Sequence, residues 1–381
     1  MSAPPPFSFR RRDLATGIAD ALLGQTPFDY SSGLFLSAPR RTGKSTFLRE
    51  DLVPELERRG IITLYVDLWS DRQRDPASLI ADVIRTALRA YDNAAVKAVK
   101  AAGLSKVGIG PFASFDIDRI GTPQGATLTD ALRALAQKSA KPVALVVDEA
   151  QHALATDAGV NAMFALKAAR DAMNQGGDGH HLTLVFTGSH RDKLSNLMLR
   201  RDQPFYGASF MDFPLLGRDY SNAYTKWLNE RLADDNGFEP DDVFAAFKIL
   251  GCRPEMLQNA LRDFALGDTK SAGLKRTLAD GAKTLRERLW EDYDRDFSQL
   301  TALQKVVLRY LIASGDRLTP FSAETLAAVS ALAGQPVAAG DMQSALEALR
   351  QKNIIWRSAR ATYALEDQDM AGWFLERHGT L

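Results

Sequence analysis

The sequence predicts an α/β domain with a parallel sheet, followed by a mostly helical region and a small C-terminal module. Three observations support this fold class. Short apolar runs alternate with helical patterns across residues 1–216, as in a doubly wound α/β domain. From Tyr220 onward the pattern is almost entirely helical. Near the C-terminus, three helical segments precede two short strand-like runs around a polar turn.

Length and composition are those of a globular protein. The 381 residues fit two or three domains at roughly 150 residues each. Apolar residues make up 45% and charged residues 25%, which is ordinary for a soluble chain. The 47 basic residues balance the 47 acidic ones, so the chain has no global basic field for nucleic acid. Any such binding must come from a local patch.

Several locations and chemistries are not expected. Cys252 is the single cysteine, so we expect neither an internal disulfide nor a cysteine metal site. This usage fits a cytoplasmic protein. The proline-rich and then basic start of the chain lacks the apolar segment of a signal peptide. No apolar run approaches the length of about 18 residues that spans a bilayer, so no membrane partner is expected.

The elements of the α/β domain follow from periodicity. Continuous apolar runs predict buried parallel strands, and amphipathic or alanine-rich segments predict the helices between them. We expect strands at residues 33–37, 61–68, 143–147, 182–187 and 210–213, and helices at 10–24, 48–59, 76–103, 127–137 and 160–173. Residues 104–126 contain several glycines and prolines and predict a surface excursion.

The turn after the first strand has the features of a phosphate-binding loop. It lies between a predicted strand and a predicted helix, the context that a Walker A motif requires. Backbone N–H groups of such a loop cradle phosphates, a lysine neutralises the β- and γ-phosphates, and a serine binds Mg²⁺. The predicted nucleotide-binding residues are Ala38, Pro39, Arg40, Arg41, Thr42, Gly43, Lys44, Ser45 and Thr46.

The loop departs from the usual motif at Ala38, and its Gly-Lys-Ser segment has a second explanation. Ala38 replaces the first glycine of the usual motif, and its Cβ restricts the backbone at the loop's entry. Lys44 is the predicted phosphate-binding and catalytic lysine, and Ser45 is a predicted Mg²⁺ ligand. The alternative is a capped helix start in which Gly43-Lys44-Ser45 occurs by chance.

The third predicted strand ends in two acids, Asp148 and Glu149, as in a Walker B motif. Mg²⁺ prefers few carboxylates together with waters, so we expect Asp148 to hold the ion through its water shell. We expect Glu149 to polarise the attacking water. The alternative is that both acids cap the next helix. Asp67 ends another strand, where a simple turn is favoured over a metal role.

The next strand ends in Thr187, Gly188 and Ser189. Open α/β sheets bind ligands just beyond the carboxyl ends of their strands. Ser189 is therefore a predicted catalytic residue, and either it or Thr187 would sense the γ-phosphate or position water. The alternative is that these hydroxyls only cap the following helix.

These motifs resemble the AAA+/STAND branch of P-loop ATPases, particularly the archaeal-type ATPase family and, more distantly, the origin-recognition ATPases. The matching segments are residues 38–46, 145–151 and 185–189. The resemblance implies a nucleotide-switched ATPase with ATP and Mg²⁺ as cofactors. It also implies a helical lid and a C-terminal winged helix behind the ATPase domain.

The resemblance points to two further arginine sites. Residues 204–208 resemble the family's Pro-Leu-Tyr-Gly-Arg segment, but Ala208 stands where the arginine is expected. Arg200 or Arg201 would substitute as an arginine finger for a neighbouring subunit; the alternative is a solvated basic pair. Arg253 begins the predicted lid helix and would reach the nucleotide, although Pro254 at a first helical turn has a sufficient structural explanation.

Three helices followed by a hairpin at residues 353–365 match a winged helix. Such modules bind DNA or proteins. Arg350, Lys352, Arg357 and Arg360 form the candidate DNA-binding patch. Asp341 and Glu347 on the same predicted helix favour a protein partner, or the module's own ATPase domain, as the alternative.

We therefore expect an ATPase domain over residues 1–216, a helical lid over 217–297 and a winged helix over 298–381. A stretch around residues 292–298 would separate the last two. The leading hypothesis is an ATPase acting on or near DNA, with a nucleotide-dependent homo-oligomer as one form. The alternative is a regulatory switch that binds a protein partner with slow or no turnover. A phosphoryl transferase ranks third, since no acceptor site is evident.

Overall fold

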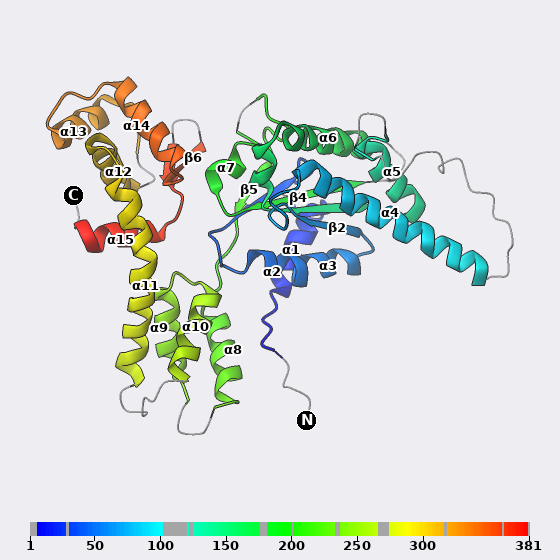
Figure 1. The fold of residues 1–381 in the computed structure, drawn as a ribbon, viewed down its shortest axis with the longest axis horizontal. Helices are drawn as coiled ribbons and strands as arrows, with labels where there is room; N and C mark the ends of the chain where they lie inside the picture. Colours follow the sequence, from blue (N-terminus) through cyan, green and yellow to red (C-terminus); the bar gives the residue numbers. More distant parts are fainter. Residues whose placement is uncertain are drawn as a thin grey trace.

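The computed structural model describes residues 6–27, 30–101, 120–121, 125–175, 181–199, 201–232, 237–265, 274–315, 318–359 and 362–379. Figure 1 shows a sheet layered between helices, with a column of helices beside it that continues into the C-terminal module.

The sheet contains five parallel strands in the order β2-β3-β4-β1-β5. They are β1 (Leu34–Ser37), β2 (Ile62–Asp67), β3 (Val143–Asp148), β4 (Leu182–Gly188) and β5 (Ser209–Asp212). Every residue of β1 and β3 is buried, which explains their uninterrupted apolar runs. The five predicted strands are confirmed, including the one near Phe210.

Helices cover both faces of this sheet (Figure 1). One face packs against α4 (Pro76–Ala101), α5 (Leu128–Ser139) and α6 (Asp157–Asn174). The other packs against α1 (Arg12–Leu22), α2 (Lys44–Phe47), the π-helical turn η1 (Leu48–Leu52) and α3 (Val53–Arg58). Alternate strand residues feed the two cores, so that Leu145 and Val147 face one and Ala144 and Val146 face the other.

Short segments connect these elements close to the strand ends. The 3₁₀ turn η3 (Ala150–Ala155) follows β3, and the short helix α7 (Arg191–Ser195) follows β4. The side chain of Thr127 accepts the backbone N–H of Asp130 and fixes the start of α5. Thr156 does the same for α6 through the N–H of Gly159.

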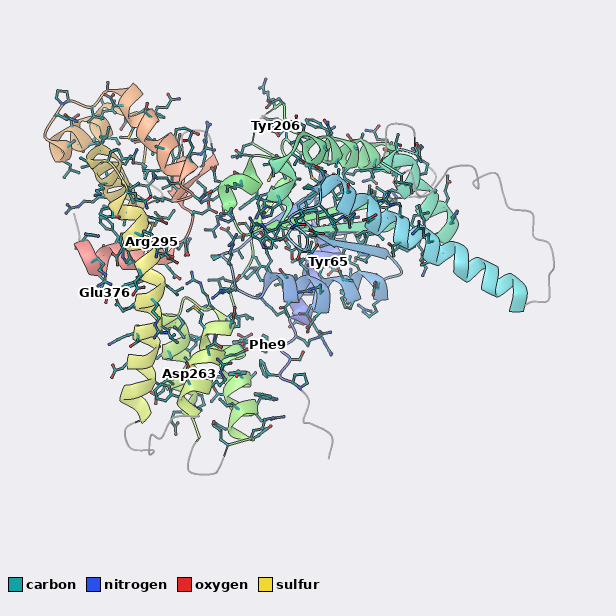
Figure 2. All side chains as sticks on the ribbon, viewed as in Figure 1. Phe9, Tyr65, Tyr206, Asp263, Arg295 and Glu376 are labelled. Carbon is teal, nitrogen blue, oxygen red and sulfur yellow. The ribbon has the colours of Figure 1, made fainter. Side chains whose placement is uncertain are left out.

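A second body is built from four helices, α8 (Arg218–Asn229), α9 (Pro240–Ile249), α10 (Pro254–Ala265) and α11 (Leu274–Ser298). Its core is aromatic and aliphatic, with Tyr220, Phe247 and Leu257 among its buried residues. Phe7 and Phe9, from the start of the chain, pack edge-on against Tyr220. Figure 2 labels Phe9 where the N-terminal segment meets these helices.

The C-terminal module contains α12 (Ala302–Ser314), α13 (Ala323–Ala333), α14 (Ala339–Gln351), the antiparallel strands β6 (Ile355–Ala359) and β7 (Thr362–Leu365), and α15 (Asp369–His378). Helix α15 crosses α11 (Figure 1). The predicted helices and hairpin are thus observed, while their assignment as a winged helix stays a prediction.

The expected separation around residues 292–298 is wrong. Helix α11 is continuous through Ser298, and its last turns belong to the C-terminal core, where Trp290, Tyr293 and Phe297 pack. Leu289 packs against both helical cores. Sequence reasoning missed this because charged residues surround Tyr293 between positions 291 and 296 and interrupt the apolar pattern, although they lie on one helix. The predicted domain limits stay predictions.

The excursion expected at residues 104–126 lies almost entirely outside the described residues. Within the part of the chain that the structure describes, no helix combines the length and apolar character needed to cross a bilayer.

Candidate functional site

The loop between β1 and α2 forms the floor of the candidate site. Gly43 has φ +86°, a backbone conformation that favours glycine, and the Thr42 hydroxyl donates to the carbonyl of Pro39 at 2.8 Å. Arg41 also has a positive φ of 66°. These conformations fold the chain tightly ahead of the first turn of α2, as a phosphate cradle requires.

Ala38 is accommodated without strain. It is not among the residues with positive φ, and its side chain is 1% exposed within the core beneath the loop. Its N–H donates to the carbonyl of Gly188 at 3.3 Å. The expected restriction by its Cβ therefore falls on a backbone conformation that alanine adopts readily. Ala38 supports the loop from below, whereas the residues from Pro39 to Thr46 line the pocket above it.

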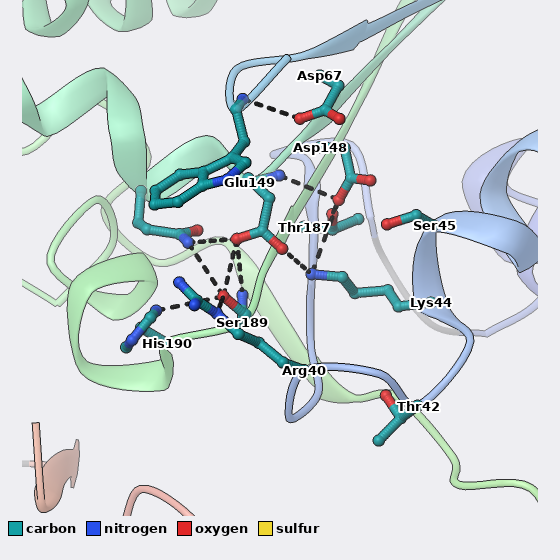
Figure 3. A network of polar contacts seen from close by, with 12 residues as sticks. Arg40, Thr42, Lys44, Ser45, Asp67, Asp148, Glu149, Thr187, Ser189 and His190 are labelled. Atoms are coloured by element: carbon teal, nitrogen blue, oxygen red, sulfur yellow. Dashed lines mark hydrogen bonds and ion pairs between the residues drawn. The ribbon is translucent and has the colours of Figure 1, made fainter. Parts of the chain in front are cut away.

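Lys44 lies between the two predicted acidic residues (Figure 3). Its Nζ is 3.1 Å from Glu149 Oε1 and 3.7 Å from Asp148 Oδ1. The three side chains are 5%, 19% and 1% exposed, so these charges interact with little screening by water. The parallel register of the sheet brings them together from the ends of β1 and β3.

Asp148 is held by hydroxyl groups as well as by Lys44. Tyr65 on β2 donates to Oδ2 at 2.9 Å, and Thr187 on β4 donates to Oδ1. Burial would raise the pKa of Asp148, but Lys44 and hydrogen bonds from Ser45, Thr187 and Tyr65 outweigh it and lower the pKa. The carboxylate therefore stays ionised beside the Ser45 hydroxyl.

Glu149 has an unusual backbone and a well-defined carboxylate position. Its φ of 53° lies in the left-handed region, which costs energy for a residue with a Cβ. Oε2 accepts from the Ser189 hydroxyl at 2.8 Å and from Gln151 Nε2 at 2.5 Å, while Oε1 faces Lys44. Burial would raise its pKa, but Lys44, Ser189 and Gln151 together lower it.

The hydroxyls after β4 have different partners. Thr187 is fully buried against Asp148, whereas Ser189 lines the pocket and contacts Glu149. Arg40 Nε donates to Ser189 Oγ at 3.4 Å, and His190 Nδ1 lies 3.2 Å from the same oxygen. Burial and the nearby Arg40 lower the pKa of His190 to about 4, so the ring is neutral near pH 7.

A pocket of about 350 Å³ opens above the loop, within the size range of ligand sites. Asp67 and Trp69 line it from the end of β2, opposite Lys44 and Ser45. The Asp67 carboxylate accepts the N–H of Trp69 at 2.8 Å. Burial, together with the charges of Asp148 and Glu149, raises the pKa of Asp67. The pocket thus brings Asp67 and Glu149 together with Lys44, Arg40 and Arg41.

Arg253 lies in a neighbouring pocket that shares Arg40 and Ser189 with the first. Its guanidinium pairs with Asp367 and Asp369, each at 2.9 Å, and is 9% exposed. Tyr293 donates to the same Asp367 oxygen at 2.7 Å. In this arrangement the C-terminal module holds Arg253, so its predicted contact with nucleotide would require those two carboxylates to release it.

Arg201 is exposed on the segment between α7 and β5 and does not line the phosphate-loop pocket. A role as an arginine finger would therefore be exerted outside this chain's own site. Arg200 lies outside the described residues.

The C-terminal module docks against α7. Arg350 donates to both carboxylate oxygens of Asp192, at 2.9 and 3.1 Å, and the Arg357 N–H donates to the same carboxylate at 3.2 Å. Glu366 accepts the backbone N–H groups of Arg191 and Asp192, and β6 lies beside α7 (Figure 1). Arg350 thus faces the chain's own ATPase domain, one of the predicted alternatives. Lys352 is exposed, and Arg360 lies outside the described residues.

Sequence reasoning missed Tyr65 and Gln151, and it did not identify Asp192 and Glu366 as the acids of the docking contact. A tyrosine inside a strand pattern indicates packing, so nothing in the sequence marked its hydroxyl as a partner of Asp148. Gln151 was visible only as the last residue of the acidic motif.

The comparisons with known proteins agree with this geometry. A family model described as an AAA domain matches residues 29–197. Residues 29–197 therefore resemble an AAA domain. A search of curated proteins gave no match.

Solved structures share the fold along nearly the whole chain. A Walker-type ATPase of Pyrococcus abyssi is 20% identical, with a TM-score of 0.53 and coverage of 96% of this chain and 97% of that one. The ORC2 protein of Aeropyrum pernix in its ADP form is 14% identical, with a TM-score of 0.55 and coverage of 98% and 93%. The predicted relation to the AAA+ branch of P-loop ATPases, and the α/β fold class, are confirmed.

Proposed function

We propose that the AAA domain binds ATP with Mg²⁺ and hydrolyses it, and that the nucleotide state moves the lid and the C-terminal module on or near DNA. The observation that carries the proposal is the convergence of Lys44, Asp148 and Glu149 at a strand–loop–helix phosphate cradle. Each residue type has a separate task there, in charge neutralisation, metal binding and water activation.

A second pocket provides a place for the base. It shares Thr42, Gly43 and Thr46 with the phosphate-loop pocket, so one ligand can extend through both. Its other lining residues are partly aromatic and apolar, including Phe9, Leu216 and Tyr220. Gln258 donates to the Tyr220 hydroxyl at 3.1 Å, which adds a polar group beside the rings. A flat heterocycle with polar edges suits this lining.

The residues around Lys44 fit a magnesium ion. Ser45 and Asp148 supply hydroxyl and carboxylate oxygens, the hard ligands that Mg²⁺ prefers, and Asp67 adds a third oxygen donor group nearby. Lys44 is shared between Asp148 and Glu149, which leaves carboxylate oxygens for a second cation beside it. When bound, the ion would neutralise charge on the β- and γ-phosphates.

Glu149 would then act on water. In hydrolysis, a water oxygen bonds to the γ-phosphorus, the bond from that phosphorus to the bridging oxygen breaks, and a water proton is accepted by Glu149. Lys44 occupies Glu149 Oε1 in this structure, at 3.1 Å. Phosphate oxygens would compete for Lys44 and leave that carboxylate oxygen available to the attacking water.

The connection from the site to the C-terminal module runs through the end of β4. Ser189 lines the pocket, and α7 begins two residues later at Arg191. The N–H groups of Arg191 and Asp192 are held by Glu366, while Arg253 bridges the lid to Asp367. A shift of Ser189 on nucleotide binding would therefore act on the contact of α7 with Glu366 and, through the adjoining Asp367, on Arg253.

DNA is the proposed partner of the C-terminal module, through Arg357 and Lys352 and, after release from Asp192, Arg350. The second candidate is a protein partner with slow turnover. It is favoured by the exposed face of α14, where Asp341 and Glu347 accompany uncharged Gln343 and Ser344. Those carboxylates repel phosphates.

Steady-state release of phosphate from ATP tests the function, measured with Mg²⁺, with a chelator, and with and without duplex DNA. We expect Mg²⁺-dependent turnover that duplex DNA changes. Turnover that ignores DNA would favour the protein partner, and binding without turnover would favour the switch.

A homo-oligomer is proposed as the assembly in which Arg201 acts. An arginine supplied in trans contributes about 10³–10⁵ in rate. Specific activity should then rise with protein concentration for the wild type and stay flat for Arg201→Ala. Lys226→Ala, an exposed change on α8, is the matched control. Equal, concentration-independent activity in all three proteins would exclude the finger.

A further inference from the structure

Gln151 lies against the predicted general base although it does not face the nucleotide loop. It follows Glu149 by two residues, in the first turn of η3, and is 4% exposed. Its side chain turns back so that Nε2 lies 2.5 Å from Glu149 Oε2 and 3.4 Å from Ser189 Oγ; Figure 3 labels these two partners. The amide therefore touches both functional side chains that follow β3 and β4.

The amide is placed at a cost to the fold. Its Oε1 is buried and has no hydrogen-bond partner among the described residues, an arrangement that disfavours folding. A Cβ added to Gly188 would lie 2.4 Å from this oxygen, so the glycine provides the space that the amide fills. An apolar side chain would avoid the unpaired oxygen. The contact of Nε2 is what a glutamine adds here.

The two oxygens of Glu149 have separate surroundings. Oε1 faces Lys44, whose partner changes when phosphates enter, whereas Oε2 is held by Gln151 and Ser189. Both donors to Oε2 lie outside the loop, and only Ser189 contacts a loop residue, Arg40, so the bond from Gln151 persists when Lys44 moves to phosphate. The carboxylate then keeps its orientation, with Oε1 directed at the loop. This matters because the left-handed backbone of Glu149 leaves its side chain without support from a regular helix.

We propose that Gln151 is a positioning residue for ATP hydrolysis, which fixes Glu149 through Oε2 while Oε1 accepts the proton of the attacking water. The inference rests on the proposed hydrolysis by this domain. Gln151 acts through Glu149 and makes no contact with the substrate. Its donor also holds the pKa of Glu149 down, together with Lys44 and Ser189.

Gln151→Met tests the proposal in the full-length protein, because methionine fills a similar volume and cannot donate. We expect kcat for ATP to fall about tenfold, the loss of one hydrogen bond to a charged group. The dissociation constant for MgATP should stay within about threefold. The acid limb of the kcat profile should move to higher pH, because the pKa of Glu149 rises when a donor is removed.

Two further variants separate positioning from packing. Gln151→Glu has the same shape but places a second carboxylate beside Glu149, and should shift the acid limb further than Gln151→Met. Gln151→Asn retains the amide one methylene short and should give an intermediate rate. Gln351→Met, an exposed change on α14, is the control. Circular dichroism confirms that each variant is folded.

The outcomes are distinct. A lowered kcat with retained affinity and a shifted acid limb supports the proposal. Unchanged kcat, or a joint loss of affinity and rate with an unmoved profile, overturns it and leaves hydrolysis intact. Absence of turnover in the wild type overturns the proposed function and this inference together.

Discussion

Two buried charged clusters, one at the phosphate loop and one where the C-terminal module docks, differ in how completely their charges are paired. At the loop, the buried Lys44 is shared by Asp148 and Glu149, and the exposed Arg40 and Arg41 line the same pocket. At the docking contact, Asp192 is matched by Arg350, and backbone N–H groups satisfy the acceptor atoms of Glu366. In the first, the loop cluster, two carboxylates share one lysine, so groups remain to pair with a ligand. In the second, the docking cluster, each of these acids has its own partners, as in an interface.

The largest expected effect comes from removing the lysine of the loop cluster. Lys44→Ala should weaken ATP binding by about 100-fold or more, because charge-assisted contacts to phosphate are lost. It also leaves two buried carboxylates without their cation, so their pKa values should rise. Titration with a fluorescent ATP analogue measures the loss. Lys226→Ala is the control, and wild-type affinity in a folded Lys44→Ala protein would contradict the loop's role.

Removing charge from the acid should separate binding from chemistry. Glu149→Gln should retain MgATP and lose turnover by about 100-fold, because an amide cannot accept the water proton. Single-turnover hydrolysis measures the step. Glu57→Gln, an exposed change on α3, is the control. A wild-type rate in Glu149→Gln would leave Glu149 with only a structural role at the start of η3.

These two clusters also show what the sequence could predict. Lys44 and Glu149 are 105 residues apart and Asp192 and Arg350 are 158 apart, so sequence separation does not explain the difference. Parallel strands end at one edge of a sheet, so apolar runs such as Val143–Val147 predict where their following residues meet. No comparable rule places α14 and the hairpin against α7. The orientation depends on side-chain packing along α11, which the sequence pattern does not reveal.

The sequence also does not reveal which groups hold the side chains of the loop cluster in place. The motif predicted Asp148 but not the hydroxyl of Tyr65, since a strand tyrosine most often packs. It predicted Arg253 as a nucleotide contact, yet the structure pairs it with Asp367 and Asp369, from a segment more than a hundred residues later. Charge and motif identify the chemistry of a residue, but its partner depends on tertiary packing.

The stability contributed by the docking cluster should depend on pH. Burial raises the pKa of Glu366 to about 7, although the hydrogen bonds from the backbone N–H groups of Asp192 and Arg191 oppose the rise. Between its ordinary pKa and about 7, the folded protein binds a proton that the unfolded chain does not, so stability falls as pH rises through this window. Glu366→Gln should remove a pH-dependent difference in the free energy of unfolding that is on the order of 2 kcal/mol.

Thermal unfolding from pH 5.5 to 8 measures this effect as wild type minus variant, which cancels other titrating groups. Glu324→Gln, exposed on α13, should behave as wild type. Parallel pH dependence in wild type and Glu366→Gln would show that Glu366 does not titrate in the window, and would break the contrast between the clusters.

The smallest expected effect concerns release of the docking contact toward DNA. Asp192 holds Arg350 through both of its carboxylate oxygens, so phosphates must compete with it for this guanidinium. Asp192→Asn removes that competition and should raise the affinity for duplex DNA severalfold. If Arg350 then contacts a phosphate, the salt slope of log K should steepen by about 0.9.

Arg350→Ala should cancel both changes in the Asp192→Asn background, while Lys352→Ala alone should lower affinity without depending on Asp192. Fluorescence anisotropy with a labelled duplex at two salt concentrations, with and without ATP, makes the measurement. Phosphate contacts position a protein without reading sequence, so two unrelated duplexes should give equal slopes. No binding at low salt, even in Asp192→Asn, would instead indicate that the docking cluster holds the C-terminal module closed. The exposed acidic face of α14 would then be assigned to a protein partner.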